Sequence, residues 1–203
     1  IEEKLYRKDS LIKRVGKANI DTSYTWKWNN DSAEWDLTGR DLKFFRANDK
    51  LLATLNQSWV STARRWRNHK RTIKKYNDGD QIVESLTQKW AHGSEDWINM
   101  ELKTIVYDNR GNKNEILYQE WKKALGKWFS TTRYLIDYNR RGVKSNIMIK
   151  AYSPDQDKWF KHSRYDFKYD EGGGHPHTAI VKEWNKRQQQ WENRGKYAMN
   201  YNI

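Results

Sequence analysis

Runs in which apolar and polar residues alternate recur along the chain, separated by short polar turns. One run is Glu115-Ile116-Leu117-Tyr118-Gln119-Glu120, and the segments after Trp97 and Trp128 are rich in Thr, Ile, Val, Leu and Tyr. Such residues in a period of two are typical of strands, because successive side chains point to opposite faces. The pattern therefore predicts strands and disfavours helices.

The turns between these runs contain residues that tolerate a left-handed backbone. They are Asn77-Asp78-Gly79, Asn109-Arg110-Gly111, Arg140-Arg141-Gly142 and Asp170-Glu171-Gly172. Glycine or asparagine supplies the positive φ that tight turns need. Pro154 and Pro176 are also predicted in turns, where a missing N–H costs no ladder hydrogen bond.

A pair of aromatic residues seven positions apart occurs six times. The pairs are Trp28 and Trp35, Trp59 and Trp66, Trp90 and Trp97, Trp121 and Trp128, Tyr152 and Trp159, and Trp184 and Trp191. Their first members step by 31, 31, 31, 31 and 32 residues. Ten residues after each pair comes a further aromatic column, at Phe45, Tyr76, Tyr107, Tyr138, Tyr169 and Tyr201. We predict six repeats, at about residues 14–45, 45–76, 76–107, 107–138, 138–169 and 169–201.

Each repeat of about 31 residues holds two strands and two turns. Strands joined by short turns pair antiparallel, so we predict an all-β meander of about 12–13 strands, forming one repeat domain over residues 1–203. Residues 3–14 supply the opening strand, and residues 172–176 form the insertion behind the 32-residue step. A single sheet this long is expected to curl, either into an open superhelical sheet or into a barrel that is open or closed.

Composition adds constraints on stability and on partners. Aromatic residues make up 14% of the chain and charged residues 32%. Burial of the large aromatic rings compensates the conformational entropy lost on folding, which so charged a chain could not otherwise offset. A net charge of +13 attracts polyanions such as nucleic acids, anionic glycans or lipid headgroups. The absence of cysteine excludes disulfides and thiolate zinc sites.

Residues at equivalent positions of successive repeats are expected to line up in columns across the sheet. Four positions before each pair lies an apolar column, predicted to be core: Tyr24, Leu55, Leu86, Leu117, Met148 and Ile180. Two positions before each pair, on the same face, lies a mostly polar column that either contacts a ligand or solvates the strands: Trp26, Gln57, Gln88, Gln119, Lys150 and Lys182.

A basic column lies five positions after each pair. Its members are Arg40, Arg71, Leu102, Arg133, Arg164 and Lys196. Because the offset is odd, this column is predicted on the face opposite the Trp and Tyr columns, together with His69, His162 and Arg194. A solvated charged face is the simpler interpretation, and a polyanion track through Arg40, Arg71, Arg133, Arg164 and Lys196 is the functional one.

The twelve paired aromatics are predicted to form a structural spine by stacking within and between repeats. Trp26, Tyr118 and Tyr134 lie outside the main columns and are the better candidates for exposed rings that stack on a ligand. His175-Pro176-His177 presents two imidazoles without a third metal ligand, so we predict no metal site. We find no catalytic constellation and expect no cofactor.

One repeat consists of a tyrosine-ended strand, the turn Tyr107-Asp108-Asn109-Arg110-Gly111-Asn112, a strand ending Gln119-Glu120-Trp121, then a loop and Trp128. This pattern resembles the tandem YD-type repeats of secreted and surface proteins of Gram-negative bacteria. The chain is similar to the short members that lack an enzyme or toxin domain. Tyr107-Asp108 and Tyr169-Asp170 keep the Tyr-Asp pair, and the other repeats do not. The resemblance implies a repetitive antiparallel sheet and gives no activity.

The leading hypothesis is a non-catalytic protein, secreted or located in the bacterial cell envelope, that binds a glycan or another surface polymer. The alternatives are polyanion or nucleic-acid binding through the basic column, and a purely structural spacer. No apolar run reaches the length of a membrane-spanning helix. The oligomeric state is left open.

Overall fold

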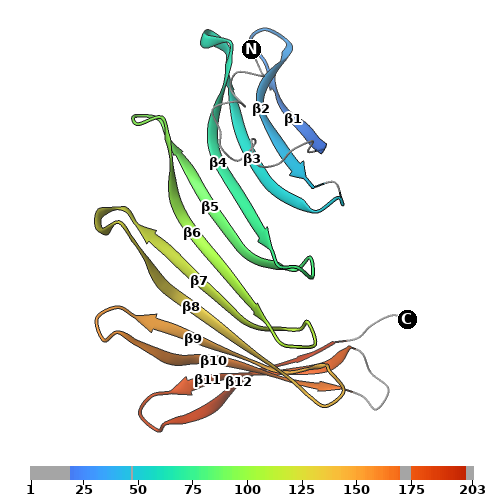
Figure 1. Cartoon of the computed structure of the whole chain (residues 1–203), viewed down its shortest axis with the longest axis vertical. Helices are drawn as coiled ribbons and strands as arrows, with labels where there is room; N and C mark the ends of the chain where they lie inside the picture. Colours follow the sequence, from blue (N-terminus) through green and yellow to red (C-terminus); the bar gives the residue numbers. More distant parts are fainter. Residues whose placement is uncertain (1–18, 47, 170–174, 200–203) are drawn as a thin grey trace. The chain divides into compact units, whose positions relative to one another are not determined.

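The computed structural model describes residues 19–46, 48–169 and 175–199. Its long elements are all strands, two from each repeat (Figure 1). The strands that lead into the aromatic-pair turns are β1 (Asn19–Asn29), β3 (Leu51–Val60), β5 (Ile82–Ala91), β7 (Lys113–Lys122), β9 (Lys144–Ser153) and β11 (Pro176–Asn185). The strands that leave those turns are β2 (Glu34–Phe45), β4 (Arg65–Tyr76), β6 (Asp96–Tyr107), β8 (Lys127–Tyr138), β10 (Lys158–Tyr169) and β12 (Gln190–Ala198).

The twelve strands follow one another in chain order in one antiparallel sheet, as the repeat predicted. The chain divides into two compact units, Ile1–Met100 and Glu101–Ile203, called unit 1 and unit 2 below. Two predictions, an opening strand at residues 3–14 and the effect of the insertion at residues 172–176, concern segments that lie wholly or mostly outside the described residues.

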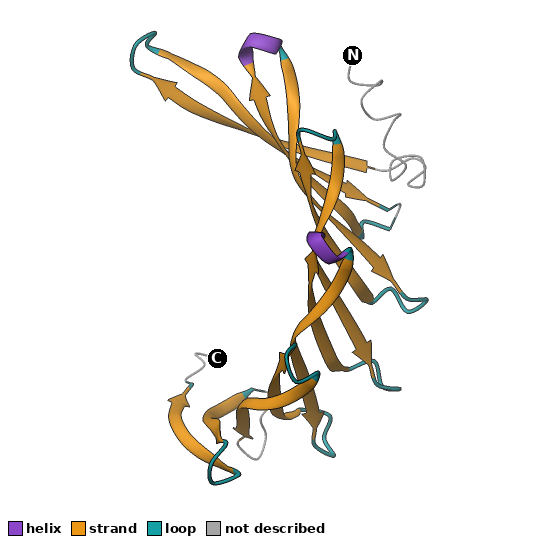
Figure 2. Ribbon diagram, turned by 90° about the vertical axis from the view of Figure 1, so that its left-hand side faces the viewer, coloured by secondary structure: helices purple, strands orange, loops and turns teal. Residues whose placement is uncertain are grey.

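Every aromatic-pair turn uses the same backbone device. The residue two positions before the second aromatic has a positive φ in all six repeats: Ala33, Arg64, Glu95, Gly126, Asp157 and Gln189. In two repeats the turn includes a short 3-10 helix, η1 (Ser61–Ala63) and η2 (Lys123–Leu125), both visible in Figure 2. Five of these six residues are not glycine, so the turn imposes a positive φ on residues that ordinarily favour a negative one.

The turns at the other end of the strands are equally regular. Positive φ falls four residues after the Phe or Tyr column, at Asp49, Asp80, Gly111 and Gly142. The expectation that glycine or asparagine supplies the positive φ is therefore wrong for the turn Asn77-Asp78-Gly79, because Asp80 does so. Gly111 and Gly142 are as predicted.

The residue after the column tyrosine closes these turns with its side chain. Asp108 Oδ1 accepts hydrogen bonds from the backbone N–H of Arg110 (2.9 Å) and of Asn112 (2.8 Å). Asn77 Oδ1 accepts one from Gln81 N–H (2.9 Å), and Asn139 Oδ1 accepts one from Val143 N–H (3.2 Å). Asn thus replaces Asp without loss of the acceptor, which explains why the Tyr-Asp pair is not kept in every repeat.

A β-bulge in the second strand of the aromatic hairpins decides which face the residues beyond it occupy. In five hairpins one residue, three positions after the second aromatic, has no cross-strand partner: Thr38, His69, Thr131, His162 and Arg194. At Thr38 and Thr131 the side-chain hydroxyl donates to a carbonyl of the facing strand, at 3.0 and 3.1 Å. One extra residue reverses the alternation beyond it.

The bulge overturns the predicted placement of the basic column. Arg71 pairs with Leu55 and Arg40 pairs with Gln57, so both lie on the face that carries the paired aromatics, called the Trp face. The Phe and Tyr column lies on the opposite face, called the Tyr face. The prediction that the cations lie opposite the tryptophans was wrong, because counting by twos ignored the unpaired residue.

The two units bury different faces of their strands. In unit 1 the core is Leu42, Phe44 and Ala53, with Leu55 packed against it, all on the Trp face. In unit 2 the most buried aliphatic side chains include Ile136, 8% exposed, which lies on the Tyr face. Pro176 is the first residue of β11 rather than part of a turn, a position where no ladder N–H is required.

Candidate ligand-binding surfaces

The six aromatic pairs face each other across their hairpins. Their ring centroids are 5.1–5.4 Å apart, with tilted or edge-to-face planes. Such contacts add about 0.5–1.5 kcal/mol beyond the area that they bury. The rings therefore hold each hairpin together, as expected for one part of the predicted spine.

Contacts between repeats are made by cations as well as by rings. The Arg40 guanidinium carbon lies 4.3 Å from the centroid of Trp66, and that of Arg71 lies 4.4 Å from Trp97. In unit 2, Lys161 Nζ lies 3.9 Å from the ring of Trp184. A positive charge over an indole face is attracted by the ring quadrupole. Arg40 and Arg71 of the basic column thus pack onto the aromatic spine of the following repeat.

The cations of unit 1 are also held by a chain of amides, here called the cross-strand row. Each row consists of three residues: one from the basic column, one from the polar column two positions before the next aromatic pair, and the residue two positions after that pair. Arg71 Nε donates to Gln88 Oε1 (2.7 Å), and Gln88 Nε2 donates to Asn99 Oδ1 (2.7 Å). The row Arg40–Gln57–Asn68 repeats both contacts at 2.7 Å. Arg40 is only 4% exposed.

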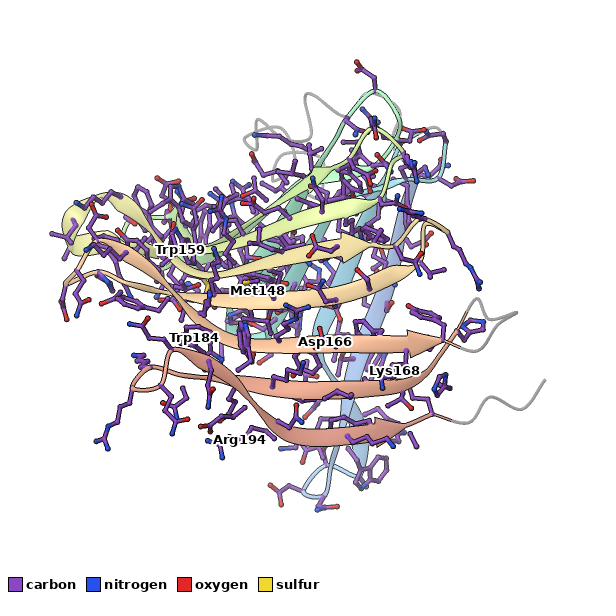
Figure 3. All side chains as sticks on the ribbon, turned by 90° about the horizontal axis from the view of Figure 1, so that it is seen from below. Met148, Trp159, Asp166, Lys168, Trp184 and Arg194 are labelled. Atoms are coloured by element: carbon purple, nitrogen blue, oxygen red, sulfur yellow. The ribbon has the colours of Figure 1, made fainter. Side chains whose placement is uncertain are left out.

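The rows of unit 2 carry more charge. The row Arg133–Lys150–Lys161 has lysines where unit 1 has Gln and Asn, and the row Arg164–Lys182–Asn193 has one lysine. Asp166 accepts from Arg164 (2.6 Å) and pairs with Lys182 (2.7 Å), so one carboxylate compensates one of the two positive charges of the second of these rows. Figure 3 shows Asp166 on β10 with Trp159 on the same strand and Trp184 on β11.

The carboxyl group of Asp166 is held as an anion by these partners. Burial alone would raise its pKa, but the hydrogen bonds from Lys182 and Arg164 outweigh that effect and lower the pKa. Arg133 has its own carboxylate partner, since its Nε lies 2.7 Å from Glu115 Oε1. Of the predicted polyanion candidates, Arg40, Arg71, Arg133 and Arg164 all make contacts within the fold, and Lys196 is exposed on β12.

An exposed aromatic surface lies at the β1–β2 hairpin of unit 1. Tyr24, Trp26 and Trp28 are 52%, 53% and 45% exposed, and Trp35 is 64% exposed. All four lie on the Trp face, because Tyr24 pairs with Arg40 and Trp28 pairs with Trp35 without an intervening bulge in β1. We call these four residues the aromatic patch.

Cations cover the equivalent tryptophans in later repeats. Trp66 and Trp97 are covered by Arg40 and Arg71 of the preceding repeats. In the part of the chain that the structure describes, no cation covers Trp35, the equivalent ring.

The three predicted ligand-stacking residues lie in different surroundings. Trp26 is exposed within the aromatic patch. Tyr118 and Tyr134 are half-buried against each other, with centroids 5.8 Å apart, and Lys103 Nζ is 5.3 Å from the Tyr118 ring. Sequence reasoning missed the exposure of Tyr24, Trp28 and Trp35, because columns make equivalent residues look alike.

The Tyr column links successive repeats on the opposite face. The hydroxyl of Tyr76 donates to the carbonyl of Leu51 (2.8 Å), and that of Tyr138 donates to Lys113 (3.0 Å). Tyr169 makes the same bond to Lys144 at 2.8 Å. Burial raises the pKa of Tyr76 and Tyr138 and keeps these hydroxyls protonated as donors. This column supports the sheet and is not available as a ligand platform.

Across residues 19–46, 48–169 and 175–199, no group of three or more His, Asp or Glu side chains is arranged to hold a metal ion. His69 and His92 lie edge to face, with centroids 6.1 Å apart, as a pair of imidazoles. Within the same residues no helix has the length and apolar character needed to cross a membrane.

Fold and surfaces together define a class: an antiparallel β-repeat protein with a face of interleaved aromatic rings and cations. The sequence matches no protein-family profile and no curated protein. Among solved structures it is similar to a Bacteroides fragilis protein of unknown function, with 11% identity, a TM-score of 0.47, and coverage of 71% of this chain and 90% of the other.

Two further solved structures share the repeated strands. A DUF3836 family protein from Bacteroides vulgatus has 8% identity and a TM-score of 0.42, over 49% of this chain and 98% of that one. A porin-like protein from Bacteroides uniformis has 12% identity and a TM-score of 0.37, over 81% of this chain and 54% of that one. Structural similarity at this level carries no argument about function. The argument about function therefore rests on the surfaces themselves.

Proposed function

We propose that this protein is a non-catalytic ligand-binding member of the YD-type β-repeat proteins, secreted or held in the bacterial cell envelope, and that it binds a glycan. One observation carries the proposal: the four rings of the aromatic patch are exposed on one face, whereas the rings equivalent to Trp28 and Trp35 in later repeats are half-buried. Exposed apolar groups gathered on one surface mark interaction sites.

The chemistry of the patch suits a sugar polymer. Trp and Tyr combine a flat apolar ring with a polar N–H or O–H, which matches the apolar ring faces and hydroxyl edges of pyranoses. Thr22 adds an exposed hydroxyl on the same face of β1, between Ile20 and Tyr24. The basic column does not carry the alternative of a polyanion track, because four of its five cations contact Gln, Asp or Glu side chains of the fold.

A glycan array followed by calorimetric titration tests the proposal. The double variant Trp26→Ala/Trp35→Ala is expected to bind the selected glycan at least about tenfold more weakly, since stacking on one ring is worth about 1–3 kcal/mol in the analogous case of bases. The matched control is Trp121→Ala/Trp128→Ala, which also removes two tryptophans, the ring pair of one hairpin in unit 2, and should leave affinity nearly unchanged.

Two results would contradict the proposal. If the wild-type chain binds no glycan on the array, the structural-spacer alternative is favoured. If the patch variant and the control lose equal affinity while circular dichroism shows both folded, the patch is not the site.

A further inference from the structure

The cross-strand row Arg133–Lys150–Lys161 differs from its equivalents in unit 1 in a way that packing does not explain. Arg133 and Lys150 are Cα partners on β8 and β9, and Lys150 and Lys161 are Cα partners on β9 and β10. Three cations therefore occupy adjacent positions across three strands of one face. Like charges directly opposite each other destabilise a sheet.

Lys150 cannot make both hydrogen bonds that the glutamine at the equivalent position in unit 1 makes. Gln88 accepts from Arg71 and donates to Asn99 at the same time. An ammonium group donates three hydrogen bonds and accepts none, so Lys150 offers no acceptor to Arg133. Arg133 instead uses Glu115 on β7, on the far side from Lys150.

Carboxylates near this row are engaged elsewhere. Glu115 pairs with Arg133, and Asp166 pairs with Arg164 and Lys182. Tyr152, two residues beyond Lys150, donates its hydroxyl to Asp157. Within the described residues neither Lys150 nor Lys161 forms an ion pair with a carboxylate. Counting Glu115, the row keeps two uncompensated positive charges.

Another like-charge pair in unit 1 shows why burial matters. Lys70 and Lys89 are also Cα partners, on β4 and β5, but both are exposed on the Tyr face. Water screens such a pair at little cost. Lys150 is half-buried, between Met148 and Tyr152 along its own strand. Its charge is therefore less well solvated and gains more from a bound counter-ion.

The aromatic rings fix the two outer cations of the row. The Arg133 guanidinium carbon lies 5.6 Å from the Trp159 centroid, and Lys161 Nζ lies 3.9 Å from that of Trp184. Figure 3 shows both rings on neighbouring strands of unit 2. These contacts restrict the side chains that flank Lys150, so an incoming anion meets cations that are already ordered.

We propose that Arg133, Lys150 and Lys161 form a binding site for a sulfate or phosphate group. An oxyanion with a charge near −2 matches the two uncompensated charges, and its several oxygens accept from more than one donor at once. The group enters either as a free ion or as a substituent of an acidic polymer. The site lies in unit 2 and does not depend on the aromatic patch, so it goes beyond the glycan proposal.

The test uses the full chain with inorganic sulfate, inorganic phosphate, a sulfated oligosaccharide and the same oligosaccharide after desulfation. The variant Lys150→Gln/Lys161→Asn installs the side chains of Gln88 and Asn99 and is expected to fold. We expect it to bind the sulfated oligosaccharide about tenfold more weakly at low salt, and to lose the rise in Tm that inorganic sulfate gives to the wild type.

The matched control is Lys70→Asn/Lys89→Gln, which removes the same charge and the same like-charge pairing in unit 1. Its affinity should stay within about twofold of wild type, because it removes two charges outside the proposed site and salt screens long-range effects. Any long-range effect of the lost charge is the same in both variants, so a larger loss in the row variant reports the site. A response to inorganic ions alone identifies a free anion, and a response to the sulfated but not the desulfated oligosaccharide identifies a polymer substituent.

The inference is overturned if the wild type responds to neither ion nor to the sulfated oligosaccharide, or if the control loses as much affinity as the row variant. Loss of neutral glycan binding in the variants of Trp26 and Trp35 is a separate readout. The two proposals can therefore fail independently.

Discussion

Units 1 and 2 are built from the same repeat, yet they use its Trp face differently. In unit 1 that face holds the core and the neutral amide rows that tie Arg40 and Arg71 in place. In unit 2 the corresponding face carries lysines in two rows, and well-buried aliphatic side chains such as Ile136 lie on the Tyr face. One backbone thus supports two distributions of charge and two arrangements of buried aliphatic side chains.

The largest effect should come from the core positions. Leu42 is 1% exposed, and its equivalent in unit 2, Leu135, is only half-buried. Leu42→Ala should lower the free energy of unfolding by about 3 kcal/mol, through lost burial and a residual cavity. Leu135→Ala should cost clearly less, and Ile136→Ala should cost more than Leu135→Ala. Urea unfolding measures all three.

A surface position controls for side-chain truncation itself. Leu125, 62% exposed, should tolerate alanine with a change within about 0.5 kcal/mol. Equal costs at Leu42 and Leu135 would show that the two units bury the same face, and the comparison would fail.

An intermediate effect is expected from making unit 1 resemble unit 2. In Gln88→Lys, Arg71 loses the acceptor at 2.7 Å and gains a like charge, while Asn99 can still accept a hydrogen bond. The expected loss is about 1–2 kcal/mol at low salt. Gln88→Glu, which restores an acceptor and adds an opposite charge, is the control and should cost less. A Gln88→Lys variant as stable as wild type would show that the amide rows contribute little.

The smallest effect concerns pH. The pKa of Asp166 is lowered in the folded state, so its contribution to stability is present above its ordinary value near 3.8 and is lost as the pH falls through the folded pKa. Asp166→Asn should therefore lose less stability than wild type on acidification from about pH 4 to about pH 2. The difference should stay under about 1 kcal/mol, since solvent screens the group. Thermal unfolding across this range measures it, and a steeper loss in the variant would contradict the assignment.

Much of the fold followed from spacing alone. The recurrence of Trp at seven and of Tyr at ten further residues predicted about 12–13 antiparallel strands, the turns and their order, because the first interval spans a turn and the second spans a strand. Gly111 and Gly142 were predicted with positive φ because glycine marks that conformation openly. Asp80 was missed, because its neighbour Gly79 offered the same signal one residue too early.

The faces of the sheet could not be derived in this way. The extra residue, for example Thr131, recurs in register with the repeat, so it leaves the 31-residue period intact while reversing the alternation after it. Arg133 was therefore assigned to the wrong face. The exposure of Trp35 was also hidden, because the exposed fraction of a ring depends on its neighbours in space and not on Trp35 itself.

The bulged position has a consequence for how such a chain tolerates insertion and deletion. Removing one residue at Thr131 would leave the Trp121–Trp128 hairpin in place but exchange the sides on which Arg133 and Tyr134 emerge. Such a deletion would expose Ile136 in place of Asp137 without touching the turn at either end. The presence or absence of one residue at this site thus determines which side chains each face presents. We expect insertions and deletions in these hairpins to occur in the turns and not at the bulge.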